Sequence, residues 1–226
     1  MLLLCNLIFN QVNIISTETY DIRFKDDGYA YLKKLISIKS YTKYFVIVDE
    51  HTKQFCLHKF KKQFSYKYEI IEISSGEINK NINICLDVWN SLTSSGADRK
   101  SLIINLGGGV ITDMGGFIAS TFKRGIDFVN IPTTLLSMVD ASIGSKTGIN
   151  FNSLKNQIGL FSDPILVIID TNYLETLSER EIKSGYAEIF KHSVISNSNF
   201  DKLVKNPNLI YNENIIANSI QLKNKI

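Results

Sequence analysis

Apolar runs of strand length alternate with amphipathic stretches of helical spacing as far as Asp170. This alternation predicts parallel strands covered by helices, because each helix returns the chain to the end of the sheet where the next strand starts. The sequence therefore predicts an α/β fold with an open, Rossmann-like parallel sheet. The predicted strands are residues 44–49, 68–73, 101–106, 127–131 and 165–170, and the predicted helices are residues 27–38 and 80–95, with Gly96 as the stop of the second.

The pattern changes after Asp170, where residues 178–205 and 212–226 have helical spacing with no strand between them. Ser178 followed by Glu181 is typical of a capping box at a helix start. We expect an α/β domain over residues 1–172 and the beginning of an all-helical domain over residues 173–226. The last helix has no stop signal, which we interpret as a truncated polypeptide; a frayed natural terminus is the alternative.

The composition favours a globular protein in a reducing compartment. A chain of 226 residues with 44% hydrophobic residues can bury a substantial core. The net charge of +3 is small and dispersed, which excludes a nucleic-acid footprint. The three cysteines, Cys5, Cys56 and Cys85, form no CxxC pair, so we expect buried thiols in a reducing compartment.

The opening residues 1–15 are apolar but do not predict a membrane segment. No basic residue precedes the apolar run, no cleavage site follows it, and Asn6 and Asn10 interrupt it. We expect an irregular start that leads into a first strand, no signal peptide or membrane anchor, and a cytoplasmic location.

Three glycines, Gly107 to Gly109, follow the strand at residues 101–106 and precede a helical stretch. Glycines at such a turn let the backbone approach a pyrophosphate, whose charge the helix N-terminus stabilises. The spacing is not GxGxxG, so a plain tight turn is the alternative. We expect Asp113 in the first turn of that helix, where it would stabilise the helix dipole or bind a ribose or nicotinamide group.

Residues 124–150 concentrate polar side chains after an apolar strand. Thr133 and Thr134 stand at the strand end, where hydroxyls can reach a cofactor, while Asp140 and Lys146 can hold hydroxyl and phosphate groups. Lys155 and Asn156 add a cation and an amide. Taken singly, each residue also fits a solvated charge or a helix cap.

Glu188, Lys191 and His192 share one face of a predicted helix. A surface ion pair explains Glu188 and Lys191 equally well as a metal-binding carboxylate beside a substrate-binding lysine. His192 stands four residues from Glu188 and is a candidate second ligand, although a lone helical histidine more often has a structural role.

The segments GGGVITDMGGF, RG, IPTTLLSMVDASIGSKT, LKNQIG and SGYAEIFK resemble the 3-dehydroquinate synthase family in order and spacing, from Gly107 to Lys191. Weaker similarity covers VIVDEHT and SGEINK upstream and extends downstream to Lys223. The resemblance implies a phosphorus–oxygen lyase of the shikimate pathway, which makes 3-dehydroquinate and phosphate from 3-deoxy-D-arabino-heptulosonate 7-phosphate. It further implies NAD, a zinc or cobalt ion, a phosphorylated sugar acid as substrate and a homodimer.

The resemblance also assigns residues. NAD would be bound by Asp49, Glu77, Lys80, Gly108, Gly109, Asp113, Thr133, Thr134, Leu135 and Thr176. The substrate would be held by Asp140, Lys146, Lys155, Asn156, Lys191 and Lys223, with Arg124 reaching the phosphate in the neighbouring subunit's site. Glu188 matches the family's metal-binding glutamate. In the implied reaction NAD oxidises a ring alcohol, which permits phosphate loss before the hydride returns, while the metal polarises oxygen atoms.

Some positions depart from the family pattern. Ser145 stands where a second glycine is usual, which would crowd the cofactor loop, and His51 stands where asparagine is common. The family's two metal-binding histidines lie beyond Lys223, so we expect the 226-residue chain alone to be inactive. The alternatives are another sugar phosphate cyclase and a non-catalytic NAD-binding fragment, whereas glycerol dehydrogenases fit the LKNQIG and GYAEIFK segments less well.

Overall fold

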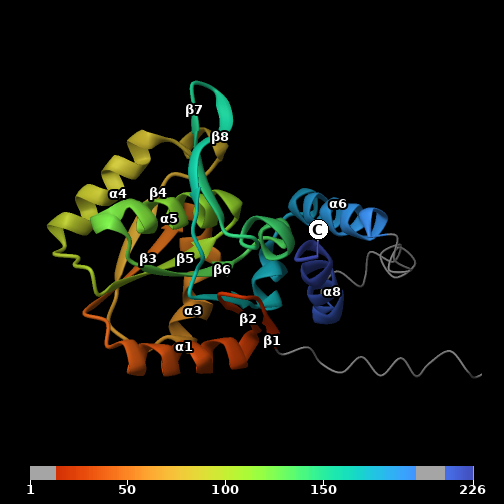
Figure 1. Cartoon of the computed structure of the whole chain (residues 1–226), viewed down its shortest axis with the longest axis horizontal. Helices are drawn as coiled ribbons and strands as arrows, with labels where there is room; N and C mark the ends of the chain where they lie inside the picture. Colours follow the sequence, from red (N-terminus) through yellow and green to blue (C-terminus); the bar gives the residue numbers. More distant parts are fainter. Residues whose placement is uncertain (1–13, 197–211, 226) are drawn as a thin grey trace, which may run out of the picture.

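The computed structural model describes residues 14–196 and 212–225. Its main sheet has the strand order β1-β2-β9-β6-β5-β3-β4, and every neighbouring pair is parallel except β1 and β2 (Figure 1). The expected open parallel sheet is confirmed. The strands are β1 (Ile14–Ser16), β2 (Asp21–Phe24), β3 (Lys43–Asp49), β4 (Glu69–Ile73), β5 (Ser101–Gly107), β6 (Asp127–Pro132) and β9 (Leu166–Ile169).

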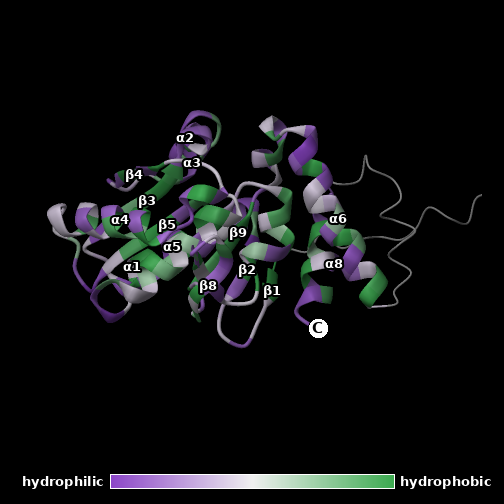
Figure 2. Cartoon of the chain, turned by 90° about the horizontal axis from the view of Figure 1, so that it is seen from above, coloured by the Kyte–Doolittle hydropathy of each residue, from purple (hydrophilic) through white to green (hydrophobic). Residues whose placement is uncertain are grey.

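Helices cover both faces of this sheet because successive residues of its central strands point to opposite sides. In β3, Val46 and Val48 belong to one hydrophobic cluster, whereas Phe45 and Ile47 belong to the other. The first cluster includes α1 (Lys25–Lys39) and α3 (Leu57–Gln63), and the second includes α4 (Ile82–Ser94) and α5 (Gly109–Thr121). Figure 2 shows hydrophobic residues along β3 and β5 and hydrophilic ones on α2 (Glu50–Phe55).

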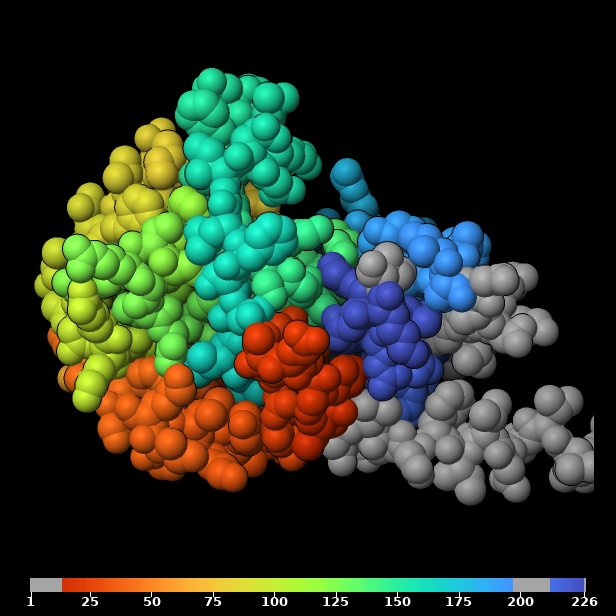
Figure 3. Space-filling model, in the orientation of Figure 1, coloured from red at the N-terminus to blue at the C-terminus, as the bar shows by residue number. Residues whose placement is uncertain are grey.

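The predicted strands and helices that lie in the described ranges are present within a few residues of the expected bounds, except that the helix predicted over residues 178–205 ends at Ile195, with Ser196 as its C-cap. Gly96 follows the end of α4 with a φ of +68°, which suits a helix stop. The elements that were missed include the strand β2, the helices α2 and α3, and a hairpin of β7 (Lys146–Phe151) and β8 (Leu154–Phe161). The hairpin projects from the body of the molecule (Figure 3).

The chain after Asp170 forms a short helix, η4 (Thr171–Thr176), then α6 (Glu179–Ile195) and α8 (Glu213–Lys223). No strand occurs in residues 171–196 and 212–225, as predicted. Ser178 caps α6 by accepting a hydrogen bond from the Glu181 amide at 3.3 Å, which is the serine half of the expected capping box. An ion pair between Lys25 and Glu213 joins α8 to the start of α1. The division into two domains stays a prediction.

Some expectations concern residues outside the described ranges. They include the irregular N-terminal start, Cys5, residues 197–205 of the helical stretch predicted over residues 178–205, and Ile226. Cys56 and Cys85 are buried free thiols, as predicted, and burial raises the pKa of each to about 12. Among the helices that the structure describes, none has both the length and the apolar character needed to span a bilayer.

Candidate active site

The glycine turn lies at the carboxyl end of β5, next to the point where the strand order reverses between β3 and β5. Gly108 is the N-cap of α5, and no side chain caps this helix. A Cβ atom on Gly108 would lie 3.0 Å from Cγ2 of Thr134, and one on Gly109 would lie 3.2 Å from Cβ of Ala141. Side chains at these positions would fill the space in front of the helix N-terminus, so the turn is a cradle that fits a pyrophosphate.

Thr133 and Thr134 follow β6 directly, at the same edge of the sheet. The Thr133 amide donates to the carbonyl of Gly107 at 3.0 Å, which ties the two strand ends together. The hydroxyls of Thr134 and Ser137 are hydrogen-bonded at 2.8 Å, at the start of the π-helix η3 (Ser137–Ala141). Leu135 is fully buried, so only its backbone is available to a cofactor.

Lys80 joins two other expected site residues. Its ammonium group lies 2.5 Å from the Asp113 carboxylate and 2.6 Å from the side-chain oxygen of Asn156, and its side chain is 4% exposed. Burial raises the pKa of Asp113, and Lys80 offsets part of this rise. The expectation that Asp113 stands in the first helical turn is wrong: α5 begins at Gly109, so Asp113 lies in its second turn and pairs with a lysine.

Other expected cofactor residues are more dispersed. Asp49 ends β3 and caps α2, accepting from the Thr52 amide at 2.7 Å. Glu77, in the short helix η1 (Glu77–Asn79), accepts from the amide of Asn150 at 2.9 Å, and the exposed Lys155 lies 3.8 Å from it. Thr176 is exposed at the end of η4.

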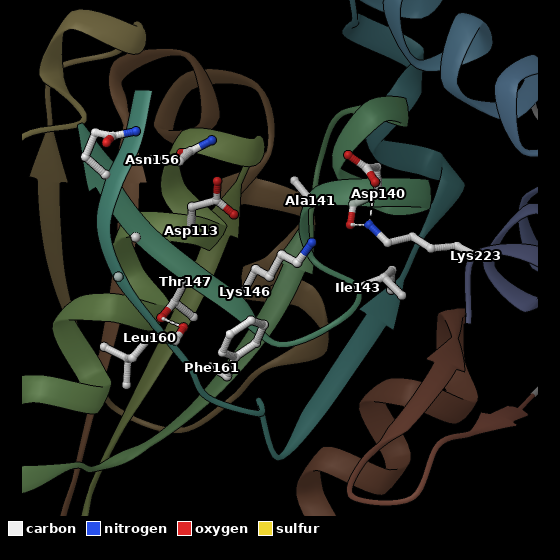
Figure 4. Close-up of a pocket in the computed structure, with 13 residues that line it drawn as sticks. Asp113, Asp140, Ala141, Ile143, Lys146, Thr147, Asn156, Leu160, Phe161 and Lys223 are labelled. Carbon is white, nitrogen blue, oxygen red and sulfur yellow. Dashed lines mark hydrogen bonds and ion pairs between the residues drawn. The ribbon is translucent and has the colours of Figure 1, made fainter. Parts of the chain in front are cut away.

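A pocket of about 470 Å³ is lined in part by Ala141. Because a Cβ on Gly109 would lie 3.2 Å from Cβ of Ala141, the pocket lies close to the glycine turn. Figure 4 shows the Lys146 ammonium pointing into this pocket, between Asp113 on one side and Asp140 with Lys223 on the other. Lys223 forms an ion pair with Asp140 and donates to its carbonyl at 2.7 Å. Lys146 makes no ion pair within the described part of the chain, so its charge is available to an anionic ligand.

Glu188 lies on α6 beside the same π-helix. Gly185, one turn earlier, brings α6 into contact with the chain after β6: a Cβ there would lie 2.5 Å from the amide nitrogen of Leu136. Glu188 forms an ion pair with Lys191, which is half-exposed. One ligand atom each from Asp140, Glu188 and His192 lie within 4.8 Å of one another. The two carboxylates of this group are ligands that a divalent metal such as zinc or cobalt accepts, whereas an imidazole is a ligand only through an unprotonated nitrogen.

His192 is 3% exposed and burial lowers its pKa, which favours the neutral imidazole. The Nδ1 atom lies 2.9 Å from the hydroxyl of Ser219 on α8, and the Nε2 atom lies 3.6 Å from Oε1 of Glu188. Sequence reasoning missed Ser219, because nothing in the sequence pairs it with α6. Gly185 was visible as a glycine inside a helical pattern, which often marks a close packing contact.

Two further positions lie away from the pocket. Arg124 is exposed at the end of the short helix η2 (Phe122–Arg124), before β6, and so lies at the opposite edge of the sheet from the pocket of its own chain, and its expected role in the neighbouring subunit's site stays a prediction. Ser145 has a φ of +65°, and its hydroxyl bonds to Asp163. Ser145 lines a second hollow together with Tyr20 and Asp163, and its expected effect on the cofactor loop stays a prediction.

A family model matches residues 70–184, and its description is 3-dehydroquinate synthase N-terminal. The chain is 42% identical over 201 residues to the 3-dehydroquinate synthase of Parabacteroides distasonis, an alignment that covers 86% of this chain and 57% of the relative. It is 36% identical over 219 residues to that of Campylobacter jejuni subsp. doylei, covering 91% and 62%. The chain therefore spans less than two thirds of these relatives.

Solved structures agree on the fold. A 2-epi-5-epi-valiolone synthase from Streptomyces hygroscopicus with NAD+ and Zn2+ bound is 26% identical, with a TM-score of 0.74 over 94% of this chain and 62% of the other. A 2-deoxy-scyllo-inosose synthase complexed with carbaglucose-6-phosphate, NAD+ and Co2+ has a TM-score of 0.78 at 23% identity, covering 92% and 60%. An iron-containing alcohol dehydrogenase from Thermotoga maritima has a TM-score of 0.69 at 14% identity, covering 93% and 68%.

Proposed function

The chain belongs to the 3-dehydroquinate synthase family, and from this premise we propose that it forms the NAD-binding part and much of the substrate site of a 3-dehydroquinate synthase. The reaction would convert 3-deoxy-D-arabino-heptulosonate 7-phosphate into 3-dehydroquinate and phosphate. The observation that carries the proposal is the pocket of Asp113, Asp140, Lys146, Asn156 and Lys223 directly beside the glycine turn.

The glycine turn supplies the site for NAD. The free amides at the start of α5 would bind the pyrophosphate, and the glycines keep this approach open. When bound, NAD supplies an acceptor and donor of hydride. The residues that would surround it are Asp49, Glu77, Lys80, Gly108, Gly109, Asp113, Thr133, Thr134, Thr176 and the backbone of Leu135.

The pocket supplies cations and hydrogen-bonding groups for a phosphorylated sugar acid. Lys146, which has no anionic partner in the described residues, would bind the phosphate or the carboxylate. Asp140 and Lys223 form an ion pair in the structure. When substrate binds, Asp140 would accept a hydrogen bond from a substrate hydroxyl and Lys223 would bind an anionic group, so each charge would keep a partner. Lys155, Asn156 and Lys191 would hold further substrate oxygens.

Glu188 would hold a zinc or cobalt ion, in line with the carboxylate of Asp140 that lies close to it. When bound, the ion supplies a Lewis acid that polarises a hydroxyl or carbonyl oxygen. Lys191, three residues along the same helix face, would keep a substrate anion beside that position.

Arg124 would act in the neighbouring subunit of a homodimer. Its distance from the pocket of its own chain supports this role, as does the exposed apolar surface of the projecting hairpin, where Phe161 is 80% and Leu154 is 59% exposed. We also place the enzyme in the cytoplasm, where the free thiols of Cys56 and Cys85 stay reduced.

The test is phosphate release from the heptulosonate phosphate by the protein expressed from its complete gene, with NAD and cobalt or zinc. We expect release that requires both additions. Glucose 6-phosphate serves as the competing substrate, because the sugar phosphate cyclases act on different sugars. Release from glucose 6-phosphate alone would assign the protein to another cyclase, and release from neither sugar would refute the proposal.

A further inference from the structure

Ser219, His192 and Glu188 form a buried row of polar groups that links α8 to α6. Ser219 is fully buried and His192 is 3% exposed. The two are joined at 2.9 Å through Oγ and Nδ1, which leaves Nε2 directed at Glu188 Oε1, 3.6 Å away and one helical turn earlier. Nothing in the proposed binding of NAD or substrate uses this row.

The proton positions follow from hydrogen-bonding capacity. A neutral imidazole has one N–H group and one lone pair. Oε1 of Glu188 is buried and has no hydrogen-bond partner within the described residues, although the Lys191 ammonium lies in ion-pair contact with it. If Ser219 donates to Nδ1, the Nε2–H group faces this oxygen. Each hydrogen-bond donor in the row then faces an acceptor.

The opposite tautomer is less favourable. If Nδ1 donated to Ser219, the lone pair of Nε2 would face the carboxylate oxygen and repel it. The Ser219 hydroxyl hydrogen would also lack an acceptor among the hydrogen bonds of the described chain. A buried donor without a partner costs about 1–3 kcal/mol, so the first arrangement is preferred.

We propose that His192 is a positioning residue, held in the Nε2–H tautomer by Ser219, which fixes the Glu188 carboxylate through Oε1 and leaves Oε2 for the metal. This inference rests on the proposed metal-binding role of Glu188. A modest rotation of the carboxylate closes the 3.6 Å separation to hydrogen-bond length. A protonated Nε2 has no lone pair to give, so His192 is not itself a metal ligand.

The row couples the metal-binding carboxylate to α8. This helix also carries Lys223, whose ammonium group is paired with Asp140. A displacement of α8 therefore changes the support of Glu188 and the contacts of Asp140 together. Groups that orient a ligand carboxylate from behind are generally worth 10- to 100-fold in metal affinity.

The tautomer can be read directly from the metal-free 226-residue chain. We would label the histidines with 15N and measure the ring nitrogen shifts, identifying His192 from the spectrum of His192→Phe. We expect Nε2 protonated and Nδ1 unprotonated. Ser219→Ala should convert this into a mixture of tautomers. Ser193→Ala is the matched control, because Ser193 is equally buried but donates to the Phe190 carbonyl at 2.8 Å. A protonated Nδ1 in the unmodified chain would overturn the proposal.

Metal affinity gives the second readout, measured by calorimetry with cobalt or zinc on the protein expressed from its complete gene. His192→Phe should bind about 10- to 100-fold more weakly, while His192→Gln, which keeps an N–H donor, should stay close to the unmodified chain. Equal affinity of His192→Phe, or a cobalt spectrum that requires His192 as a ligand, would overturn the inference. The tautomer is measured without metal or NAD. Its result therefore tests the arrangement of His192 even if the proposed function is wrong.

Discussion

The ammonium group of Lys80 lies 2.5 Å from the carboxylate of Asp113, and the same group binds Asn156 on the projecting hairpin. The family resemblance assigns Lys80 to NAD binding. Lys80 therefore also holds Asp113 on α5 and strand β8 of the hairpin in place. Lys80 has little exposed surface, so its charge depends on these partners.

Lys80→Met should destabilise the fold by about 3 kcal/mol, because it leaves Asp113 buried without its cation. Urea unfolding of the two proteins measures this difference. Lys53→Met is the matched control: Lys53 pairs with Glu72 on the surface, and its loss should cost at most about 1 kcal/mol. Adding Asp113→Leu to Lys80→Met should restore part of the stability. Equal losses for Lys80→Met and Lys53→Met would contradict the assignment of a buried pair.

Lys146→Ala should weaken binding of the phosphorylated substrate on the order of 10- to 100-fold without changing the fold. A charge-assisted hydrogen bond is worth about 1.5–3 kcal/mol, and Lys146 points into the pocket with its charge unpaired in the described structure. Calorimetric titration with the heptulosonate phosphate in the presence of NAD measures the change. Lys183→Ala, on the exposed side of α6, should leave affinity unaltered. Unchanged binding by Lys146→Ala would remove this lysine from the site.

The buried thiol of Cys85 should make stability depend on pH under alkaline conditions. Burial raises the pKa of Cys85 to about 12, above its value near 9 in the unfolded chain. The folded state therefore keeps a proton that the unfolded state loses, so the contribution of Cys85 is complete below pH 9 and declines as the pH rises above it. The free energy of unfolding should fall more steeply between pH 8.5 and about 10.5 in the unmodified chain than in Cys85→Ala. Parallel slopes would show that the thiol is accessible to water.

The sequence could predict the central strands because their apolar runs have few competing interpretations. The hairpin was missed because the polar residues 155–157 hide its alternation. Its pairing depends on Gly148 and Gly159, where backbones approach closely: a Cβ on Gly148 would lie 2.7 Å from the carbonyl oxygen of Ile158. Helical spacing was enough to put Glu188 and His192 on one face. The contact of His192 with Ser219 depends on how α6 and α8 pack, which no local pattern encodes.

Gly108→Ala should weaken NAD binding about tenfold or more while the chain stays folded. Its φ of −75° is compatible with alanine, so the backbone is not strained. The added methyl group would lie 3.0 Å from Thr134 and occupy the space in front of the helix N-terminus. Fluorescence titration with NADH, alongside thermal unfolding, separates lost affinity from lost stability. A variant that melts normally and binds NADH as tightly as the unmodified chain would show that the cofactor lies elsewhere.

The most direct test of the account is calorimetric titration of the folded 226-residue chain with NAD. The glycine turn, the open N-terminus of α5 and the pocket beside them predict one NAD per chain, with binding that Gly108→Ala weakens. A folded sample that shows no heat of binding at millimolar NAD would contradict the central claim that this sheet edge is a cofactor site.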